Sequence, residues 1–146
     1  MIEGIIFDWI GTLYERNKGP FPFSEKVLRE LKKKYKLGLI SLAKHDRDKR
    51  EKEIKDSDLT KYFDFIMIDN TKHSYQYKLC MTQMKTTPEN TAIVDDRVIR
   101  SIKTGNGLGC QTYWIQKGEY EKELPNKETG EPTFRINSVE DLLTLL

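Results

Sequence analysis

The 146-residue sequence is poor in cysteine, with only two such residues and no CxxC pair. So few cysteines, without that spacing, give no indication of a disulfide framework or of a cysteine-ligated zinc site. Cys80 and Cys110 are therefore predicted to be reduced, partly buried residues of a cytoplasmic protein.

An excess of one charge and a long apolar run are also missing. Lys and Arg number 25 against 23 Asp and Glu, and the resulting net charge of +2 does not by itself indicate a nucleic-acid partner. The apolar amino terminus is interrupted by Glu3 and Asp8, which argues against a signal peptide and a membrane span. Without internal repeats or long low-complexity segments, residues 1–146 are predicted to form a single domain.

What the sequence does contain is an alternation of strand-like and helical segments, which predicts an α/β fold. The apolar run before Asp8, followed by Gly11 and Thr12, is typical of a buried strand that breaks into a turn. A strand buried on both faces implies a mainly parallel sheet covered by helices, which is a three-layer α/β/α domain. Five further strands are predicted at residues 36–43, 65–68, 91–94, 111–115 and 133–136, the last of them at an edge.

Helices are predicted between these strands from caps and apolar spacing. Ser24 is the predicted N-cap of a helix that runs to about Tyr35, and another helix covers roughly residues 74–84. The highly charged segment from His45 to Lys55 is predicted to be an exposed helix or loop.

Two helices and a long loop are predicted in the carboxyl-terminal half by the same signals. Val98, Ile99 and Ile102 mark the inner face of a helix that Gly105 and Gly107 are predicted to end. The polar segment 117–133 is rich in turn residues and is predicted to be a mobile surface loop. Ser138 is the predicted N-cap of a final helix.

Polar side chains stand where four predicted strands end. Because the carboxyl ends of parallel strands lie at one edge of a sheet, these groups are expected to converge. Carboxylates from two strands favour Mg²⁺, and a nearby hydroxyl and ammonium would hold phosphate oxygens. This pattern predicts phosphoryl transfer or hydrolysis with Asp8 as a nucleophile. The residues concerned are Asp8 and Thr12 after the first strand, Ser41 in the second, Lys72 after the third, and Asp95 and Asp96 after the fourth.

Each of these residues also has a structural interpretation. A lone Asp8 could cap a helix, one of Asp95 and Asp96 could cap the next helix, and Ser41 could merely satisfy backbone groups. The functional interpretation is favoured for Asp8 because Asp96 is in register with it. Lys72 is favoured over Lys78, which falls on a helix face predicted to be solvated.

The order and spacing of these residues resemble the four motifs of the haloacid dehalogenase superfamily of hydrolases over nearly the whole chain. DWIGTL resembles the first motif, the Ser41 strand the second, Lys72 the third and VDDR the fourth. The resemblance implies a Rossmann-like sheet in which the strands, numbered along the chain, lie in the order 5-4-1-2-3. It also implies that Asp8 is the nucleophile and a Mg²⁺ ligand, that Asp96 is a second ligand assisted by Asp95, and that Lys72 bridges nucleophile and phosphate.

The sequence departs from the phosphatases of this superfamily at Ile10, where they usually carry a second Asp. By the resemblance, that Asp protonates the leaving oxygen and then activates water, and losing such a group costs about 10²–10⁴ in rate. Its contact with the metal is made by the backbone carbonyl, which Ile10 retains. His45 and Glu15 are the weak candidates for a replacement base.

The spacing of the motifs leaves no room for a cap domain, either between Thr12 and Ser41 or between Ser41 and Lys72. An open site suits a phosphorylated substrate that is macromolecular or loosely held, or a cap supplied by a partner subunit in a homo-oligomer. Two functions remain open at this point. One is a Mg²⁺-dependent phosphatase-type hydrolase that acts through an aspartyl-phosphate at Asp8. The other is a catalytically impaired relative that serves as a binding or regulatory module.

Overall fold

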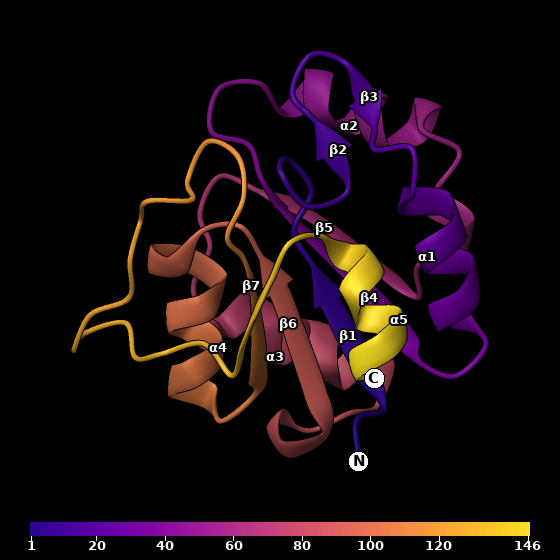
Figure 1. Cartoon of the computed structure of the whole chain (residues 1–146). Coiled ribbons are helices and arrows are strands. Elements are labelled where there is room, and N and C mark those ends of the chain that lie inside the picture. The colour runs from indigo at the N-terminus through magenta and orange to yellow at the C-terminus, as the bar shows by residue number, and fades with distance from the viewer.

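The computed structural model describes residues 1–146 and is built around a six-stranded parallel sheet (Figure 1). Along the sheet the order is β5-β4-β1-β6-β7-β8, so the predicted order with the first strand central is confirmed, with the sixth strand at one edge. No cap domain is present. The strands are β1 (Gly4–Phe7), β4 (Lys36–Leu42), β5 (Phe65–Asp69), β6 (Thr91–Asp95), β7 (Gln111–Ile115) and β8 (Phe134–Ile136).

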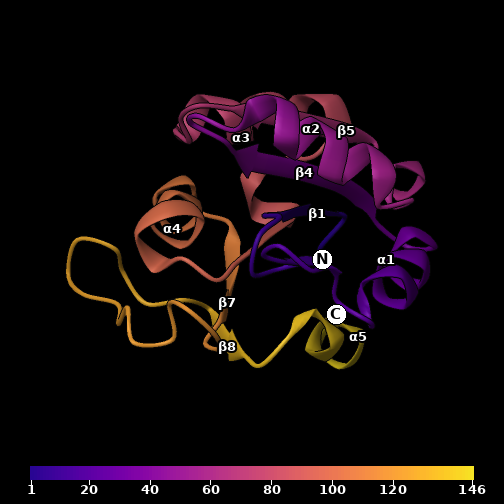
Figure 2. The ribbon, with the colours of Figure 1, turned by 90° about the horizontal axis from the view of Figure 1, so that it is seen from above.

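Helices cover both faces of this sheet, which confirms the three-layer α/β/α fold (Figure 2). On one face lie α1 (Ser24–Lys32) and α5 (Leu142–Leu145), and on the other lie α3 (Ser74–Met84) and α4 (Lys103–Leu108). Beyond the carboxyl ends of the strands lie α2 (Arg47–Asp56) and a hairpin of β2 (Tyr14–Glu15) and β3 (Gly19–Pro20) (Figure 1). Short helical turns occupy Thr60–Tyr62, Pro88–Asn90, Val98–Ile102 and Val139–Asp141.

Alternating side chains let each strand contribute to two apolar cores. In β1, Ile5 and Phe7 join the core beneath α1 and α5, whereas Ile6 packs with Tyr77 and Cys80 of α3. Because both faces are covered in this way, every residue of β1 is buried. This double burial explains why the strand is continuously apolar in sequence until Asp8.

Helix α1 begins differently from the prediction. Phe23, not Ser24, is its N-cap residue, and Ser24 is the first residue of the helix. The buried Ser24 hydroxyl donates instead to the Leu13 carbonyl oxygen at 2.7 Å. It therefore fixes the helix to the segment that follows β1. The other predicted cap, Ser138, is confirmed, since its Oγ accepts from the backbone N–H of Glu140 at 3.2 Å.

Two details of the helix after β6 were predicted wrongly. Val98 and Ile102 are buried, but Ile99 is 52% exposed because Val98–Ile102 forms a π-helical turn, which shifts the inward face. Helix α4 also continues past Gly105 and ends at Gly109, whose φ is 89°. Gly105 serves close packing rather than termination, because a Cβ there would lie 2.7 Å from the Thr112 methyl carbon.

The charged segment predicted to be an exposed helix or loop forms α2, and two of its side chains are buried. Ile54 packs into the core, and Arg50 turns inward toward β4. The predicted loop 117–133 contains no helix or strand. No helix of the chain is long and apolar enough to cross a bilayer.

Candidate active site

The strand ends bring the predicted carboxylates together at one edge of the sheet. Asp8 directly follows β1, Asp95 ends β6, and Asp96 is the next residue. Each of the three offers a carboxylate oxygen, and these oxygens all lie within 4.8 Å of one another. The convergence predicted from parallel strand ends is therefore present in the structure.

Lys72 reaches the same place from the segment after β5. Its Nζ donates to Asp8 Oδ1 at 2.6 Å and lies 3.7 Å from Asp95 Oδ2, and its side chain is only 3% exposed. Burial alone would lower the pKa of Lys72, but the charges of Asp8, Tyr77 and Asp95 raise it above its ordinary value. Lys72 is thus a permanently charged partner of Asp8.

Burial and mutual repulsion govern the protonation of the three carboxyl groups. Burial and the charge of Asp95 raise the pKa of Asp8 to about 6, and burial with the charges of Asp95 and Asp8 raises that of Asp96 to about 9. Burial opposes the ionisation of Asp95 as well. The charge of Lys72 and several hydrogen bonds, of which the one from Ser101 is the strongest, outweigh burial and lower the pKa of Asp95. The single positive charge of Lys72 does not balance three carboxyl groups. Carboxylate oxygens that lie this close together are suited to bind a divalent cation such as Mg²⁺.

The turn after β1 is pressed against Asp96. Gly11 has a φ of +81°, and a Cβ on it would lie 2.1 Å from Asp96 Oδ2, so only glycine fits there. Ile10 precedes it, half-buried and packed against the core. Its side chain has no group that can transfer a proton. Its role as a carbonyl ligand stays a prediction.

Thr12 and Ser41 are both buried, but their hydroxyls differ in their partners. Thr12 Oγ1 has no hydrogen-bond partner, whereas Ser41 Oγ accepts from Arg50 Nη1 at 2.7 Å. The same guanidinium donates to the Leu42 carbonyl oxygen at 2.7 Å. Arg50 therefore orients Ser41, whose own O–H stays free to donate.

A hollow of about 230 Å³ reaches Asp8, and the structure lines it with cations that the sequence argument missed. Arg50 was overlooked because it lies in an alternately charged segment, where only its spacing of four residues from Ile54 signals an inward face. Lys44 and Arg100 take part in no ion pair of the structure, so their charges remain available to a ligand. The cationic residues of this hollow are Arg16, Lys44, Arg50, Arg97 and Arg100.

The loop after β7 folds against this hollow. Glu123 accepts from Arg97 Nε at 3.0 Å, and the Arg97 guanidinium carbon lies 3.8 Å from the centre of the Tyr120 ring. Glu119 of the same loop forms an ion pair with Arg16 at 3.8 Å. The loop therefore meets both the segment after β6 and the β2–β3 hairpin.

The two candidates for a replacement base do not line the hollow at Asp8. His45 is exposed, and Glu15 faces a neighbouring cavity. The acidic group that does line the hollow, beside Asp8 and Asp96, is Asp46, whose Oδ2 lies 3.5 Å from Arg50 Nη2. Asp46 precedes α2 and carried no sequence signal beyond its position soon after the Ser41 strand.

Comparison with known proteins gives an independent result. The sequence profile of the haloacid dehalogenase-like hydrolases matches residues 2–115. The search of the curated proteins found no match. The profile match covers β1 to β7 and therefore the acidic cluster, Lys72, Thr12 and Ser41, but not the loop residues Glu119, Tyr120 and Glu123.

Solved structures of two small proteins match the whole chain. A protein from Listeria monocytogenes serotype 4b superposes with a TM-score of 0.78 at 18% identity, over 99% of this chain and 98% of its own. A HAD-superfamily hydrolase, subfamily IA, variant 1, from Geobacter sulfurreducens gives 0.76 at 13% identity, over 100% of both chains. At such identities the likeness shows the fold.

A larger structure matches over part of its length. The HAD-hydrolase YfnB from Bacillus subtilis, in a structure described as bound to magnesium, has a TM-score of 0.72 and 20% identity. The match covers 87% of this chain but only 56% of YfnB. The shared part is thus the α/β/α domain, within a longer relative.

Proposed function

Because the chain belongs to the haloacid dehalogenase-like hydrolase family, we propose that it is a Mg²⁺-dependent hydrolase that cleaves a phosphate ester through an aspartyl-phosphate at Asp8. One observation carries this proposal. Lys72 holds Asp8 Oδ1 at 2.6 Å while the carboxylates of Asp95 and Asp96 lie within 4.8 Å. A nucleophile, a fixed cation and two further oxygen ligands are the groups that phosphoryl transfer requires.

The donor set fits Mg²⁺, because three carboxyl groups lie together and burial, with their mutual repulsion, raises the pKa values of Asp8 and Asp96. Asp8, Asp96 and the Ile10 carbonyl would hold the ion, with Asp95 assisting. Bound there, it would polarise phosphoryl oxygens and offset their charge.

The chain's own residues supply the remaining steps of the proposed reaction. The hydrogen bond from Lys72 orients Asp8, and the second oxygen, Oδ2, would attack phosphorus as the bond to the leaving oxygen breaks. Ser41, oriented by Arg50, would donate its O–H to a phosphoryl oxygen. Water would then cleave the phospho-aspartate and restore Asp8.

Ile10 predicts which step is slow. Attack by Asp8 needs no proton transfer from residue 10, whereas protonation of the leaving oxygen and activation of water do. A good leaving group would therefore react, and the aspartyl-phosphate would persist. The same feature favours the second candidate function, a catalytically impaired relative that acts as a binding or regulatory module.

The decisive experiment measures Mg²⁺-dependent hydrolysis of p-nitrophenyl phosphate by the wild type, Asp8→Asn and Ile10→Asp. We expect slow turnover by the wild type, none by Asp8→Asn, and an increase of about 10²–10⁴ for Ile10→Asp, since that change restores a positioned acid and base. A silent wild type with an active Ile10→Asp would favour the binding or regulatory module. Silence from all three folded proteins would contradict the proposed reaction.

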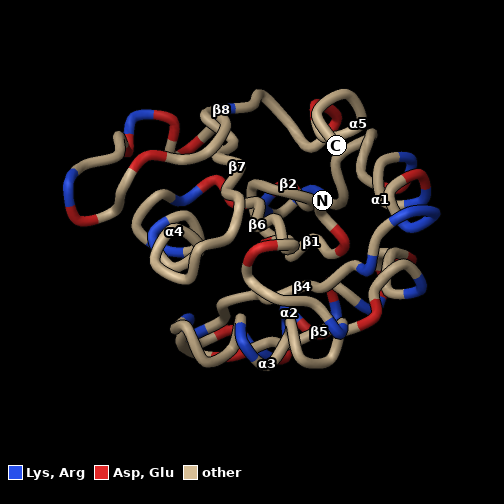
Figure 3. Tube along the Cα trace, turned by 90° about the horizontal axis from the view of Figure 1, so that it is seen from below, with Lys and Arg blue, Asp and Glu red and all other residues tan.

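We also propose that the partner is a phosphorylated molecule rather than a nucleic-acid duplex. Figure 3 shows basic and acidic residues interspersed along the Cα trace instead of basic residues gathered on one side. The absence of a cap domain supports a substrate that reaches the site from a large molecule or in a homo-oligomer whose second copy covers it. Gel filtration with and without substrate tests the second of these.

A further inference from the structure

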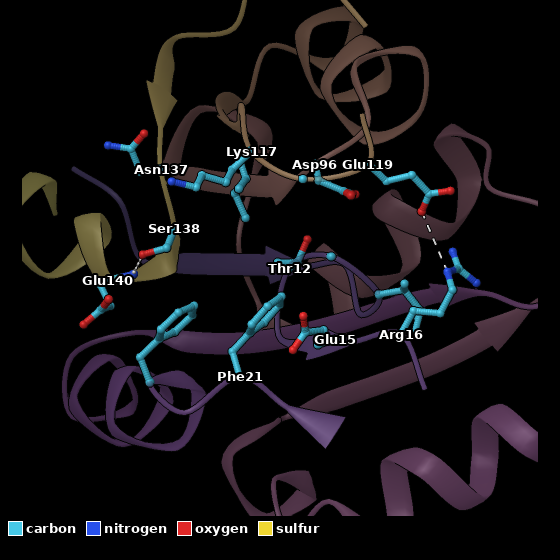
Figure 4. Close-up of a pocket in the computed structure, with 15 residues that line it drawn as sticks. Thr12, Glu15, Arg16, Phe21, Asp96, Lys117, Glu119, Asn137, Ser138 and Glu140 are labelled. Atoms are coloured by element: carbon cyan, nitrogen blue, oxygen red, sulfur yellow. Dashed lines mark hydrogen bonds and ion pairs between the residues drawn. The ribbon is translucent and has the colours of Figure 1, made fainter. Parts of the chain in front are cut away.

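A second cavity, here called the side pocket, adjoins the hollow at Asp8 and is larger, at about 600 Å³ (Figure 4). Ile10, Arg16 and Asp96 line both spaces, so the two meet at these residues. A volume of this size is typical of sites for small organic molecules. The side pocket therefore offers room for the part of a substrate that extends from a phosphate at Asp8.

An aromatic wall bounds the side pocket. The rings of Phe21 and Phe23 are stacked, with centroids 5.3 Å apart and an angle of 8° between their planes. Phe23 packs against the apolar core, whereas Phe21 does not belong to that core and its ring points into the pocket (Figure 4). Phe21 is only half-buried, so it presents a ring face on which a ligand can stack.

Polar groups line other parts of the side pocket. The Asn137 side chain makes no hydrogen bond to the protein, and the Ser138 hydroxyl accepts one from Glu140 but keeps its own O–H to donate. Figure 4 shows both residues across the space from the Arg16–Glu119 ion pair. An amide and a hydroxyl can form hydrogen bonds with the nitrogen and oxygen atoms of a heterocyclic ring.

The charges of the two spaces have opposite signs. Five cations line the hollow at Asp8 with three acidic residues, which suits an anion. In the side pocket, acidic residues outnumber basic ones, and Arg16 is already paired with Glu119. A second anionic group of a ligand would be repelled there. The charged residues of the side pocket are Glu15, Asp96, Glu119 and Glu140 against Arg16 and Lys117.

We propose that the side pocket binds the organic part of the phosphorylated substrate and that this part is a planar aromatic ring system without negative charge, of the size of a nucleobase. The inference rests on the proposed function, which places the phosphate at Asp8. Phe21 supplies the stacking face, and Asn137 and Ser138 supply hydrogen bonds. Ile10 gives an apolar contact between the two spaces.

The test uses adenosine and cytidine, which carry rings but no phosphate, and ribose 5-phosphate with Mg²⁺, which carries a phosphate but no ring. Binding is measured by calorimetry for the wild type, Phe21→Leu and Phe134→Ala. Phe134 is a matched control, because it is 38% exposed and stacked on Tyr113 but does not line the side pocket. Thermal melts establish that each variant is folded.

We expect the wild type to bind at least one nucleoside, Phe21→Leu to weaken that binding about tenfold, and Phe134→Ala to leave it unchanged. Ribose 5-phosphate should bind all three proteins equally. No binding of either nucleoside at millimolar concentration, or equal loss in both variants, would overturn the inference. Phosphatase turnover without nucleoside binding would reject the inference and keep the proposed function, whereas Phe21-dependent nucleoside binding without turnover would reject the proposed function alone.

Discussion

Lys72 and Asp8 are 64 residues apart in sequence, yet their 2.6 Å contact helps each buried side chain to carry its charge. The ammonium favours ionisation of a buried carboxyl group, and the carboxylates keep the buried amine charged. Solvent compensates neither charge well, because the two side chains are only 3% and 12% exposed. The charged states of Lys72 and Asp8 thus depend on a contact that only the folded chain makes.

Replacing Lys72 tests this pairing. Lys72→Met should lower the free energy of unfolding by about 3 kcal/mol in metal-free buffer, because it leaves buried carboxylates without their cation. Urea denaturation measures the change. Lys78→Met, an exposed lysine of α3, is the control and should alter stability little. Equal effects of the two changes would contradict a special role for Lys72.

The raised pKa values of Asp8 and Asp96 predict how stability varies with pH. A carboxyl group whose folded-state pKa is raised contributes stability that is full below its unfolded pKa, near 3.8, and is lost as pH rises through the folded value. These values are about 6 and about 9, so the metal-free protein should lose stability between pH 5 and pH 9 from these two groups. The lowered pKa of Asp95 acts in the opposite direction, at lower pH.

Mg²⁺ favours the ionised carboxylates, so its stabilising effect should grow over the same range. Thermal melts from pH 5 to pH 9, with EDTA or with Mg²⁺, measure both trends. A Mg²⁺-induced rise in Tm that is largest at pH 5 would contradict the assignment of these groups as ligands.

At the scale of elements, the turn after β1 shapes the site by its close approach to Asp96. Gly11→Ala would place a Cβ 2.1 Å from Asp96 Oδ2 at a φ of +81°. The carboxylate must move, so we expect at least about a tenfold loss of Mg²⁺ affinity, a cost comparable to that of disturbing groups that orient metal ligands. Mg²⁺ titration followed by thermal shift measures it.

Gly107→Ala is the control for this substitution. Gly107 lies within α4 and has an ordinary φ, and a Cβ added to it would meet no other part of the molecule within 4 Å. Alanine there should leave Mg²⁺ affinity unchanged and raise helix stability slightly. If both glycine variants bind Mg²⁺ like the wild type, the close approach of Gly11 does not matter for the metal.

In helix α2, the pattern of charged residues does not show which charged side chain is buried. Its sequence, RDKREKEIKD, predicts a solvated face, and most of its residues are exposed. Ile54 and Arg50 are buried, and the Arg50 side chain, 7% exposed, donates to Ser41 and Leu42. An arginine can be buried when its donors find acceptors. Here Ser41 and Leu42 of β4 accept from Nη1, and Glu53 of the same helix accepts from Nε at 3.1 Å. The helix therefore contributes to the site rather than only to solubility.

At the scale of the whole molecule, the sheet edge without a cap leaves two adjoining spaces of different character. The hollow at Asp8 is rich in cations, and the side pocket combines an aromatic wall with excess acidic residues. The β2–β3 hairpin and the loop after β7 border both spaces and meet through the Arg16–Glu119 ion pair. Selectivity for a substrate can therefore reside in loops of the α/β/α domain itself.

The sequence alone determined the α/β class and the convergence of Asp8, Lys72, Asp95 and Asp96, because apolar periodicity and strand ends are local features that a parallel sheet brings to one edge. The strand order was predicted from the resemblance to the haloacid dehalogenase superfamily, and the structure confirms it. The tertiary structure decided the inward turn of Arg50, the folding of the 117–123 segment against Arg97, and the side pocket beside Ile10. These features depend on contacts between segments distant in sequence. Burial and distance in three dimensions, which no local pattern encodes, set the partners and charges of such groups.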